Sequence, residues 1–503
     1  MLCYNIIVVE GRLYFMKVDN FFSFKDFIKE HKKELLILFS IFLFGIYTII
    51  RANVNYKDDL GRVAFGYQGW QDFSRYLSCL LSNFIHADSY LTDVSPLPQV
   101  IGTFVLALSG LMTLSLLSPK KNYSIYELFA LVPLGLSPYF LECISYKYDA
   151  PYMALSILFS IFPLLFHKYK KYIYIIMCFI SSLIVCTTYQ ASSGIFPMFV
   201  ILLSLIMWNK KSELKKIIEF IVLSIIGYCG GLLLFKGFLT MPYTTDYVSY
   251  DIPKSGKIFY ETLSHLKIYY NCIINDFKPE WLLFIGLICI GFIYVMIRDS
   301  KQKKLHSLFI STISLVLMLL ICFGAYPLLS QPLYAPRSMY GFGVFIALIG
   351  IVIILSKNVY FFKIIYIALC WSFFVFSFTY GNALASQKEY SNFRIESVLN
   401  DLKDLDIITD ETITNIQITG SIGNAPNIRN MPQSYDILNK LMPITFGDSS
   451  YSYAYFQLAY YYNLKNLRWS HTFDFTSYDL PILKDNYYHT IKGNDKYILI
   501  ILK

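Results

Sequence analysis

The chain is organised around residues 35–62, whose sequence is LLILFSIFLFGIYTIIRANVNYKDDLGR. Residues 35–50 form an apolar run without a charge, which predicts a first membrane-spanning helix. Two adjacent carboxylates and an arginine follow this run at once, and the polar segment continues to Arg75. Charged and aromatic side chains gathered directly after a span have the composition of a functional site.

The whole chain has the composition of a polytopic membrane protein. Of its 503 residues, 56% are hydrophobic and 15% are charged, and the mean hydropathy is +0.49. The formal net charge of +9 does not indicate a nucleic-acid partner, because the lysines and arginines stand in short clusters between apolar runs. Clusters of this kind encode the orientation of a protein in a bilayer.

The apolar runs predict about eleven spans, or as few as nine if some of the shorter runs are re-entrant. The expected spans are 35–50, 98–117, 125–141, 150–166, 172–188, 195–208, 217–239, 281–297, 305–327, 340–355 and 360–380.

The alternation of lysine clusters along the chain predicts which connections lie on the same side of the membrane. The clusters at 120–121, 168–171, 210–216, 298–304 and 357 mark every second connection as cytoplasmic. The loops 51–97, 142–149, 189–194, 240–280 and 328–339 are therefore expected to face the other way. The lead, residues 1–34, is expected to stay in the cytoplasm because it has no small-residue cleavage site. We expect the residues before Met16 to be dispensable.

The tail from residue 381 to residue 503 has no apolar run long enough to span and predicts a small α/β domain. An odd number of spans would place it outside. The expected elements are helices at 386–405, 434–441 and 452–462 and strands at 412–419 and 497–502. The predicted fold class is thus an α-helical polytopic membrane protein with a small C-terminal α/β extracytoplasmic domain.

Cysteine and metal chemistry are not expected to contribute. Ten cysteines lie mostly inside apolar runs and lack metal-ligand spacing, which is typical of small buried side chains. No cofactor or metal is predicted. A divalent cation between a carboxylate and a phosphate is compatible with the sequence, but nothing in the spacing requires one.

The candidate catalytic residues are Asp58 and Asp59. Their mutual repulsion favours a proton on one of them, so one would act as a base and the other would orient a hydroxyl. The aromatic side chains of Tyr67 and Trp70 are suited to stacking on a sugar. The alternative is a solvated turn or a helix N-cap.

Further candidates lie on the other loops of the same side. Lys147 and Asp149 follow Glu142 at the second turn, where they could instead be snorkelling interface residues. Arg337 on a third loop suits a phosphate, with an interface anchor as the alternative. The weaker candidates are Asp93, which we expect to cap the second span, and Gln190, in a turn that usually only caps helices.

The shared side of these residues indicates chemistry between a lipid-borne donor and an extracytoplasmic acceptor. The sequence has no glycine-rich phosphate loop for a nucleotide.

The stretches 58–62, 66–70, 91–97, 146–149 and 188–190 resemble the phage-type serotype-converting O-antigen glucosyltransferases of the glucosyl transferase Gtr-II family. The resemblance covers about residues 35–380 and is most specific at Asp-Asp-Leu-Gly-Arg. It implies an architecture similar to the C-type glycosyltransferases and transfer of glucose from undecaprenyl-phosphate glucose to a sugar of the lipid-linked O-antigen repeat in the periplasm. It further implies a bacterial inner membrane and companion proteins that make and flip the donor.

The expected mechanism is inverting: Asp58 or Asp59 removes the acceptor proton, while Arg62, Lys147 and Arg337 stabilise the phosphate. Tyr67, Trp70, Arg75, Asp93, Asp149 and Gln190 are expected to bind sugar or to support the site. Three alternatives stay open. They are an O-antigen polymerase or ligase, a transporter or flippase of the same lipid-linked sugar, and a non-catalytic membrane receptor.

Overall fold

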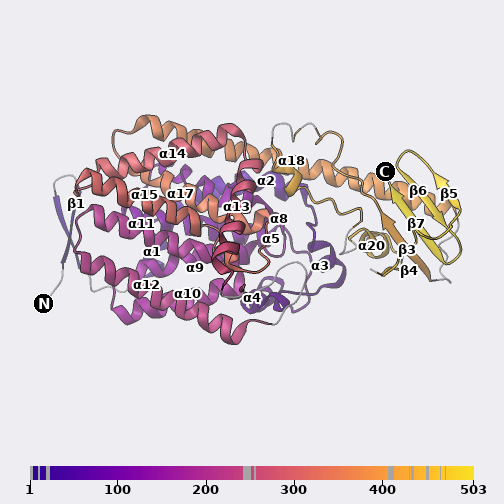
Figure 1. The fold of residues 1–503 in the computed structure, drawn as a ribbon, viewed down its shortest axis with the longest axis horizontal. Coiled ribbons are helices and arrows are strands. Elements are labelled where there is room, and N and C mark those ends of the chain that lie inside the picture. Colours follow the sequence, from indigo (N-terminus) through magenta and orange to yellow (C-terminus); the bar gives the residue numbers. More distant parts are fainter. Residues whose placement is uncertain are drawn as a thin grey trace.

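A computed structural model describes residues 4–9, 12–17, 23–241, 251–253, 256–405, 413–429, 431, 435–448, 453–464, 466–470 and 472–503. These residues form an elongated molecule with a long helical bundle and a small sheet beyond one end of it (Figure 1). The strands β1 (Tyr4–Val9) and β2 (Arg12–Lys17) pair in antiparallel fashion at the other end.

Helices build most of the molecule. Those before residue 240 are α1 (Phe24–Glu30), α2 (Lys32–Ala52), α3 (Asp59–Phe65), η1 (Gln71–Phe73), α4 (Tyr76–His86), α5 (Leu97–Leu117), α6 (Ile125–Phe129), α7 (Val132–Leu136), α8 (Pro138–Ser145), α9 (Ala150–Ile161), η2 (Phe162–Phe166), α10 (Lys171–Thr188), η3 (Gln190–Gly194), α11 (Ile195–Asn209), α12 (Leu214–Leu234) and η4 (Phe235–Leu239). The later ones are α13 (Ile258–Asp276), α14 (Pro279–Arg298), α15 (Lys304–Ile321), η5 (Tyr326–Leu328), α16 (Pro336–Met339), α17 (Gly341–Leu355), α18 (Tyr360–Asp404), α19 (Leu438–Leu441), α20 (Tyr453–Phe456) and η6 (Gln457–Tyr461).

Each of the eleven apolar runs named above is helical, but not all are long enough to span. Among the described residues, eight helices are long and apolar enough to cross a membrane. The run at 125–141 is broken into α6–α7 and α8, bent by 65°, and counts as a ninth span if it crosses as one unit. The runs at 150–166 and 340–355 form shorter apolar helices. The membrane class is therefore confirmed, while the number eleven stays a prediction.

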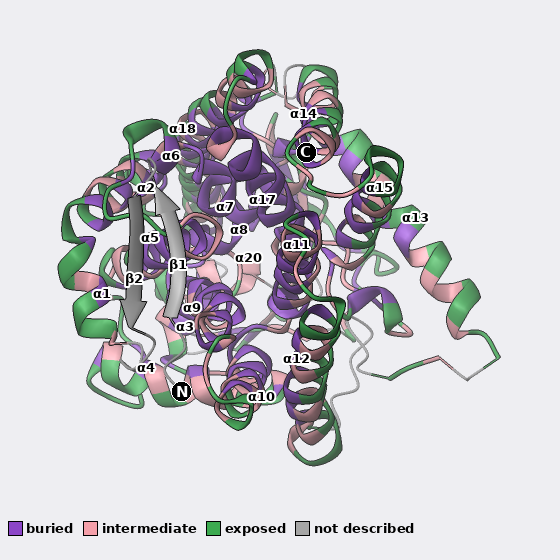
Figure 2. Cartoon of the chain, turned by 90° about the vertical axis from the view of Figure 1, so that its left-hand side faces the viewer, coloured by how far each residue is buried: buried purple, intermediate pink, exposed green. Residues whose placement is uncertain are grey.

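The centre of the bundle is occupied by helices that are buried on every side. Figure 2 shows α7, α8 and α17 in the middle, with exposed residues on the outer faces of α10, α12 and α13. From Gly341 to Ile354 every residue of α17 is buried. A helix that is apolar all round needs such a position.

The two ends of the bundle differ in chemistry, as the alternation of lysine clusters predicts. Three of the basic connections meet at one end, where Lys301 N–H donates to the Asn209 carbonyl at 2.8 Å and Arg298 donates to the Lys357 carbonyl at 2.6 Å. The loops with the candidate residues contact one another at the other end. Which end faces the cytoplasm remains a prediction.

The last span and the first tail helix are one element, α18, which passes through the expected boundary at residue 380. Its 45 residues give a length of about 68 Å, roughly twice the apolar thickness of a bilayer. Gly381 does not end the helix but allows close packing on α2, since a Cβ there would lie 2.5 Å from the Thr48 carbonyl carbon. α18 therefore carries the tail away from the bundle.

The tail contains a five-stranded sheet in the order β4-β3-β7-β6-β5. Its strands are β3 (Thr414–Thr419), β4 (Leu467–Arg468), β5 (Ile482–Asp485), β6 (His489–Gly493) and β7 (Tyr497–Leu502). β3 is parallel to β4 and β7, whereas β6 is antiparallel to β5 and β7. The end of α18 packs on this sheet through Ile395, Val398 and Leu402.

Some expected boundaries differ from the structure. The sequence predicts a loop at 240–280, but most of the described part of this segment is helix α13. The short strands β4, β5 and β6 are not among the predicted elements. The expected helix at 434–441 is reduced to the turn α19, and residue 434 lies outside the described residues, as does residue 412 of the expected strand.

Candidate functional site

Helix α3 places the first acidic and basic candidates on one buried face. Asn53, which follows α2, has a left-handed conformation (φ 46°). Gly66, which follows α3, also does (φ 63°), and its N–H donates to the Arg62 carbonyl at 2.7 Å. Asp59 and Arg62 are three residues apart and therefore neighbours on the helix. Asp59 Oδ1 lies 3.6 Å from Arg62 Nη1.

Asp59 is fully buried and is held by backbone donors. Its Oδ2 accepts hydrogen bonds from Lys147 N–H at 2.9 Å and from Tyr56 N–H at 3.2 Å. Its Oδ1 has no hydrogen-bond partner among the described residues. Burial raises the pKa of Asp59 to about 7; Arg62 opposes the rise and the carboxylate of Asp149 adds to it. A carboxylate that titrates near neutral pH is suited to act as a general base.

Asp149 joins Arg62 to Trp70. Its Oδ2 pairs with Arg62, and its Oδ1 accepts a hydrogen bond of 2.6 Å from Trp70 Nε1. The Arg62 guanidinium lies 4.7 Å from the centroid of the Trp70 ring. Trp70 is only 1% exposed and packs edge-to-face against Tyr152. The expectation that Trp70 stacks on a sugar does not fit this position, because both faces of the ring are enclosed by the protein.

Lys147 is held between Asn55 and Asp93. Its Nζ donates to Asn55 Oδ1 at 2.8 Å and to Asp93 Oδ2 at 3.1 Å. Asp93 does not cap the second span, because the N-cap of α5 is Pro96 without a side-chain bond. The pKa of Asp93 is lowered although burial opposes this, because Ser95 and Lys147 donate hydrogen bonds to the carboxylate. Asp93 therefore orients Lys147.

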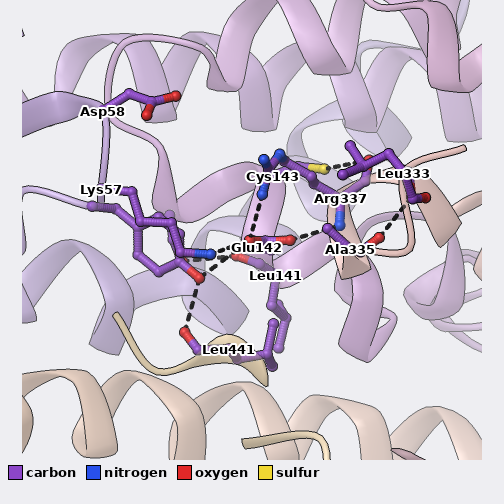
Figure 3. Close-up of polar contacts among 12 residues, drawn as sticks. Lys57, Asp58, Leu141, Glu142, Cys143, Leu333, Ala335, Arg337 and Leu441 are labelled. Carbon is purple, nitrogen blue, oxygen red and sulfur yellow. Dashed lines mark hydrogen bonds and ion pairs between the residues drawn. The ribbon is translucent and has the colours of Figure 1, made fainter. Parts of the chain in front are cut away.

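Glu142 is the centre of a second group of charges (Figure 3). It is fully buried, and its Oε1 accepts from Lys57 Nζ at 2.9 Å and from Arg337 Nη1 at 3.0 Å. Its Oε2 accepts from Arg337 N–H at 2.7 Å. Tyr56 connects this group to Asp59, because its hydroxyl lies 3.4 Å from Glu142 Oε1 while its N–H binds Asp59. In the sequence, Glu142 stands at the same turn as Lys147 and Asp149, but it was not predicted to be a site residue.

Arg75 and Gln190 form a third group beside the second. Arg75 Nε donates to Gln190 Oε1 at 3.2 Å, and Gln190 Nε2 donates to the Phe73 carbonyl at 3.0 Å. The Arg75 guanidinium lies 4.6 Å from the Tyr189 ring centroid, and the Tyr189 hydroxyl donates to the Arg337 carbonyl at 3.0 Å. The structure thus brings three groups from loops at the same end of the bundle into one connected network.

Asp58 and Tyr67 lie at the exposed edge of this network, where both interact electrostatically with Arg62. Figure 3 shows Asp58 away from the contacts around Glu142, and its Oδ1 accepts from the Tyr453 hydroxyl at 3.0 Å. Tyr67 is 46% exposed and lies over Gly61. Burial is the largest cause of the raised pKa of Asp59 and the Asp149 carboxylate adds to it, so the expected repulsion by the adjacent Asp58 is not the main reason for protonation.

A cavity of about 300 Å³ lies beside this network, between the loop after α2 and the tail. It is lined by Asn53, Val54, Asn55, Leu60, Asp93, Lys147, Leu384, Gln387, Lys388, Ser391, Asn392, Pro443, Thr445, Gln457, Tyr461 and Tyr462. The tail residues among them carried no signal in the sequence, because nothing local indicates that residues about 400 positions apart in the chain meet, as Asn55 and Tyr461 do. Across the described ranges, no group of three or more His, Cys, Asp or Glu side chains is placed to hold a metal ion.

A bundle of apolar helices with a buried network of charges at one end defines a membrane-embedded protein with an interior polar site. The sequence model of the glucosyl transferase GtrII family matches residues 47–348, more than half of the chain. The chain therefore belongs to this family, and it is a membrane glycosyltransferase.

One curated relative supports the same assignment. It is a protein of Salmonella phage P22 described as an uncharacterized 55.3 kDa protein in the gtrB 5' region. The two sequences are 27% identical over 410 residues, which cover 77% of this chain and 82% of the relative. No solved structure matches the chain.

Proposed function

We propose that the chain transfers glucose from undecaprenyl-phosphate glucose to a sugar of the lipid-linked O-antigen repeat, with inversion at the anomeric carbon. The observation that carries the mechanism is the buried carboxylate of Asp59, which keeps one oxygen without a hydrogen bond to the described residues and whose pKa is raised by burial to about 7. In this proposal Asp59 removes the proton of the acceptor hydroxyl as that hydroxyl attacks the sugar.

The balance of charges selects the residues that stabilise the leaving phosphate. Arg62 faces Asp149 and Asp59, and Lys147 faces Asp93, so neither group has an excess of positive charge. Two cations, Lys57 and Arg337, share the single carboxylate of Glu142. Their side chains are 28% and 15% exposed, respectively. A phosphate is stabilised where two cations converge, and we assign it to Lys57 and Arg337.

The proposed location is a bacterial inner membrane with the site at the periplasmic face. The basic connections at the opposite end of the bundle support this orientation, because lysine-rich short loops stay in the cytoplasm. The tail would then be periplasmic. A donor synthase and a flippase would supply the lipid-linked glucose, and their presence is a requirement of the proposal.

The proposal is tested with the full-length chain in lipid nanodiscs. Undecaprenyl-phosphate [¹⁴C]glucose and lipid-linked O-antigen repeats from a ligase-deficient Salmonella strain are the substrates, and NMR of the product reports the anomeric configuration. We expect transfer with inversion by the wild-type chain and a loss of about 10² to 10⁴-fold in Asp59→Asn. Retention of configuration, or full activity in Asp59→Asn, would contradict the mechanism; no transfer by the wild-type chain would contradict the function.

A further inference from the structure

The cavity next to Leu60 and Lys147 lies where the loop after α2 meets α18 and the tail. One wall comes from the loop after α2 and the other from α18 and the tail. Asn55 Nδ2 donates to the Tyr461 hydroxyl at 2.7 Å across this junction. The volume of the cavity, about 300 Å³, is at the lower end of the range of small-molecule sites, roughly 300–1,000 Å³.

The lining of the cavity is polar but mostly neutral. Nine of its sixteen residues carry an amide or a hydroxyl, and the amides are Asn53, Asn55, Gln387, Asn392 and Gln457. The two lysines that line it are already bound: Lys147 to Asn55 and Asp93, and Lys388 to the Asn53 carbonyl at 2.9 Å. Neutral donors and acceptors match the hydroxyls of a saccharide better than they match a phosphate.

Gln457 contributes to this lining a side chain with one buried acceptor atom that has no hydrogen-bond partner among the described residues. Its Nε2 lies 3.4 Å from Thr445 Oγ1, while its Oε1 is buried and accepts no hydrogen bond within the described part of the chain. Gln457 also begins η6, a π-helical turn that ends at Tyr461 on the same cavity. Such turns occur frequently at functional sites, and a buried acceptor without a partner is a place for a donor from a ligand.

We propose that this cavity binds the acceptor sugar and that Gln457 Oε1 accepts a hydrogen bond from one of its hydroxyls. The inference rests on the proposed function and adds a specificity-determining residue to it. The donor glucose is attached directly to a phosphate, which we assign to Lys57 and Arg337, and these two residues do not line the cavity. Asp59 does not line it either, but its neighbours Leu60 and Lys147 do, so the cavity lies next to the proposed base. A sugar in the cavity is therefore the acceptor.

The test compares Gln457→Ala with Gln457→Glu, which keeps an oxygen acceptor, in the nanodisc assay described above. Rates are measured while the lipid-linked repeat and the undecaprenyl-phosphate glucose are varied separately. Gln457→Ala is expected to raise the acceptor KM about five- to ten-fold, with kcat and the donor KM within two-fold of wild type. Gln457→Glu is expected to stay within three-fold of wild type.

The matched control is Asn427→Ala, which removes an exposed tail amide that binds Ser386 outside the cavity. It should leave both KM values unchanged. An unchanged acceptor KM in Gln457→Ala, or an increase in the donor KM instead, would overturn the inference while leaving the proposed function intact. Equal losses in both Gln457 variants would indicate a purely structural role and would overturn it as well. Absence of transfer by the wild-type chain refutes the proposed function itself.

Discussion

The pKa of Asp59 makes the pH dependence of transfer a sensitive test of the site. Asp59 acts as a base only when it is ionised, so the rate rises with pH through its pKa of about 7. The ionised fraction is about one tenth at pH 6 and about nine tenths at pH 8, which predicts an increase of about ten-fold in kcat/KM. This rise of the rate with pH, the acidic limb of the profile, should be absent from the residual activity of Asp59→Asn.

Replacing Asp149 by asparagine should lower the pKa of Asp59 and so move the acidic limb of the pH–rate profile to lower pH. Both carboxylates contact the same nitrogen of Arg62, so their nearest oxygens lie within about 6 Å of each other. At an effective dielectric constant of about 20, this separation corresponds to a repulsion of about 3 kcal/mol, or about two pH units. Because the new amide keeps an oxygen for Trp70 Nε1 and leaves Arg62 to Asp59, we expect a decrease of one to two units.

The assay is the initial rate of glucose transfer between pH 5 and pH 9 at constant ionic strength. In Asp149→Asn the ratio of rates at pH 8 and pH 6 should fall from about ten-fold to about two-fold or less. Asp72→Asn, which removes an exposed carboxylate from the same loop, should keep the wild-type profile. A limb that does not move in Asp149→Asn, or that survives in Asp59→Asn, would refute the assignment of the base.

Three further substitutions probe the surroundings of the base. Glu142→Ala leaves the cations of Lys57 and Arg337 without their shared carboxylate and should cost on the order of 3 kcal/mol, seen as a lower melting temperature of the detergent-solubilised protein. Trp70→Phe removes the hydrogen bond to Asp149 and weakens the stacking under Arg62, and the transfer rate should fall about ten-fold with little change in expression. Asp58→Asn changes an exposed carboxylate that accepts from the Tyr453 hydroxyl and should leave the transfer rate within about three-fold of wild type; a loss as large as that of Asp59→Asn would move the base to Asp58.

The sequence predicted the helical body well because apolar runs are a local signal. All eleven runs are helical, and three of the five basic connections contact one another at one end of the bundle. The length of α18 was not predicted, because the composition turns polar after residue 380 although the helical hydrogen bonding continues. Gly381 suggested an end, whereas its role is the close approach to α2. The short strands β4 and β5 were too brief to give a periodic pattern.

The sequence predicted which residues form the candidate site better than it predicted which of their side chains contact one another. Asp59, Arg62, Lys147 and Asp149 meet as expected, because they follow spans that end on the same side. Which cation faces which carboxylate depends on contacts between loops far apart in the sequence. Glu142 therefore remained unassigned although it holds Lys57 and Arg337. The burial of Trp70 and the contribution of the tail to the cavity depend on the same long-range packing.

The most direct test of the central claim is mass spectrometry of lipopolysaccharide O-chains from cells that express this chain with the donor-making partners. The wild-type chain should add one hexose mass to the O-antigen repeat, and Asp59→Asn should leave the repeat unmodified at equal levels of membrane-inserted protein. An unchanged repeat mass with the wild-type chain, or a hexose increment that persists in Asp59→Asn, would contradict the account.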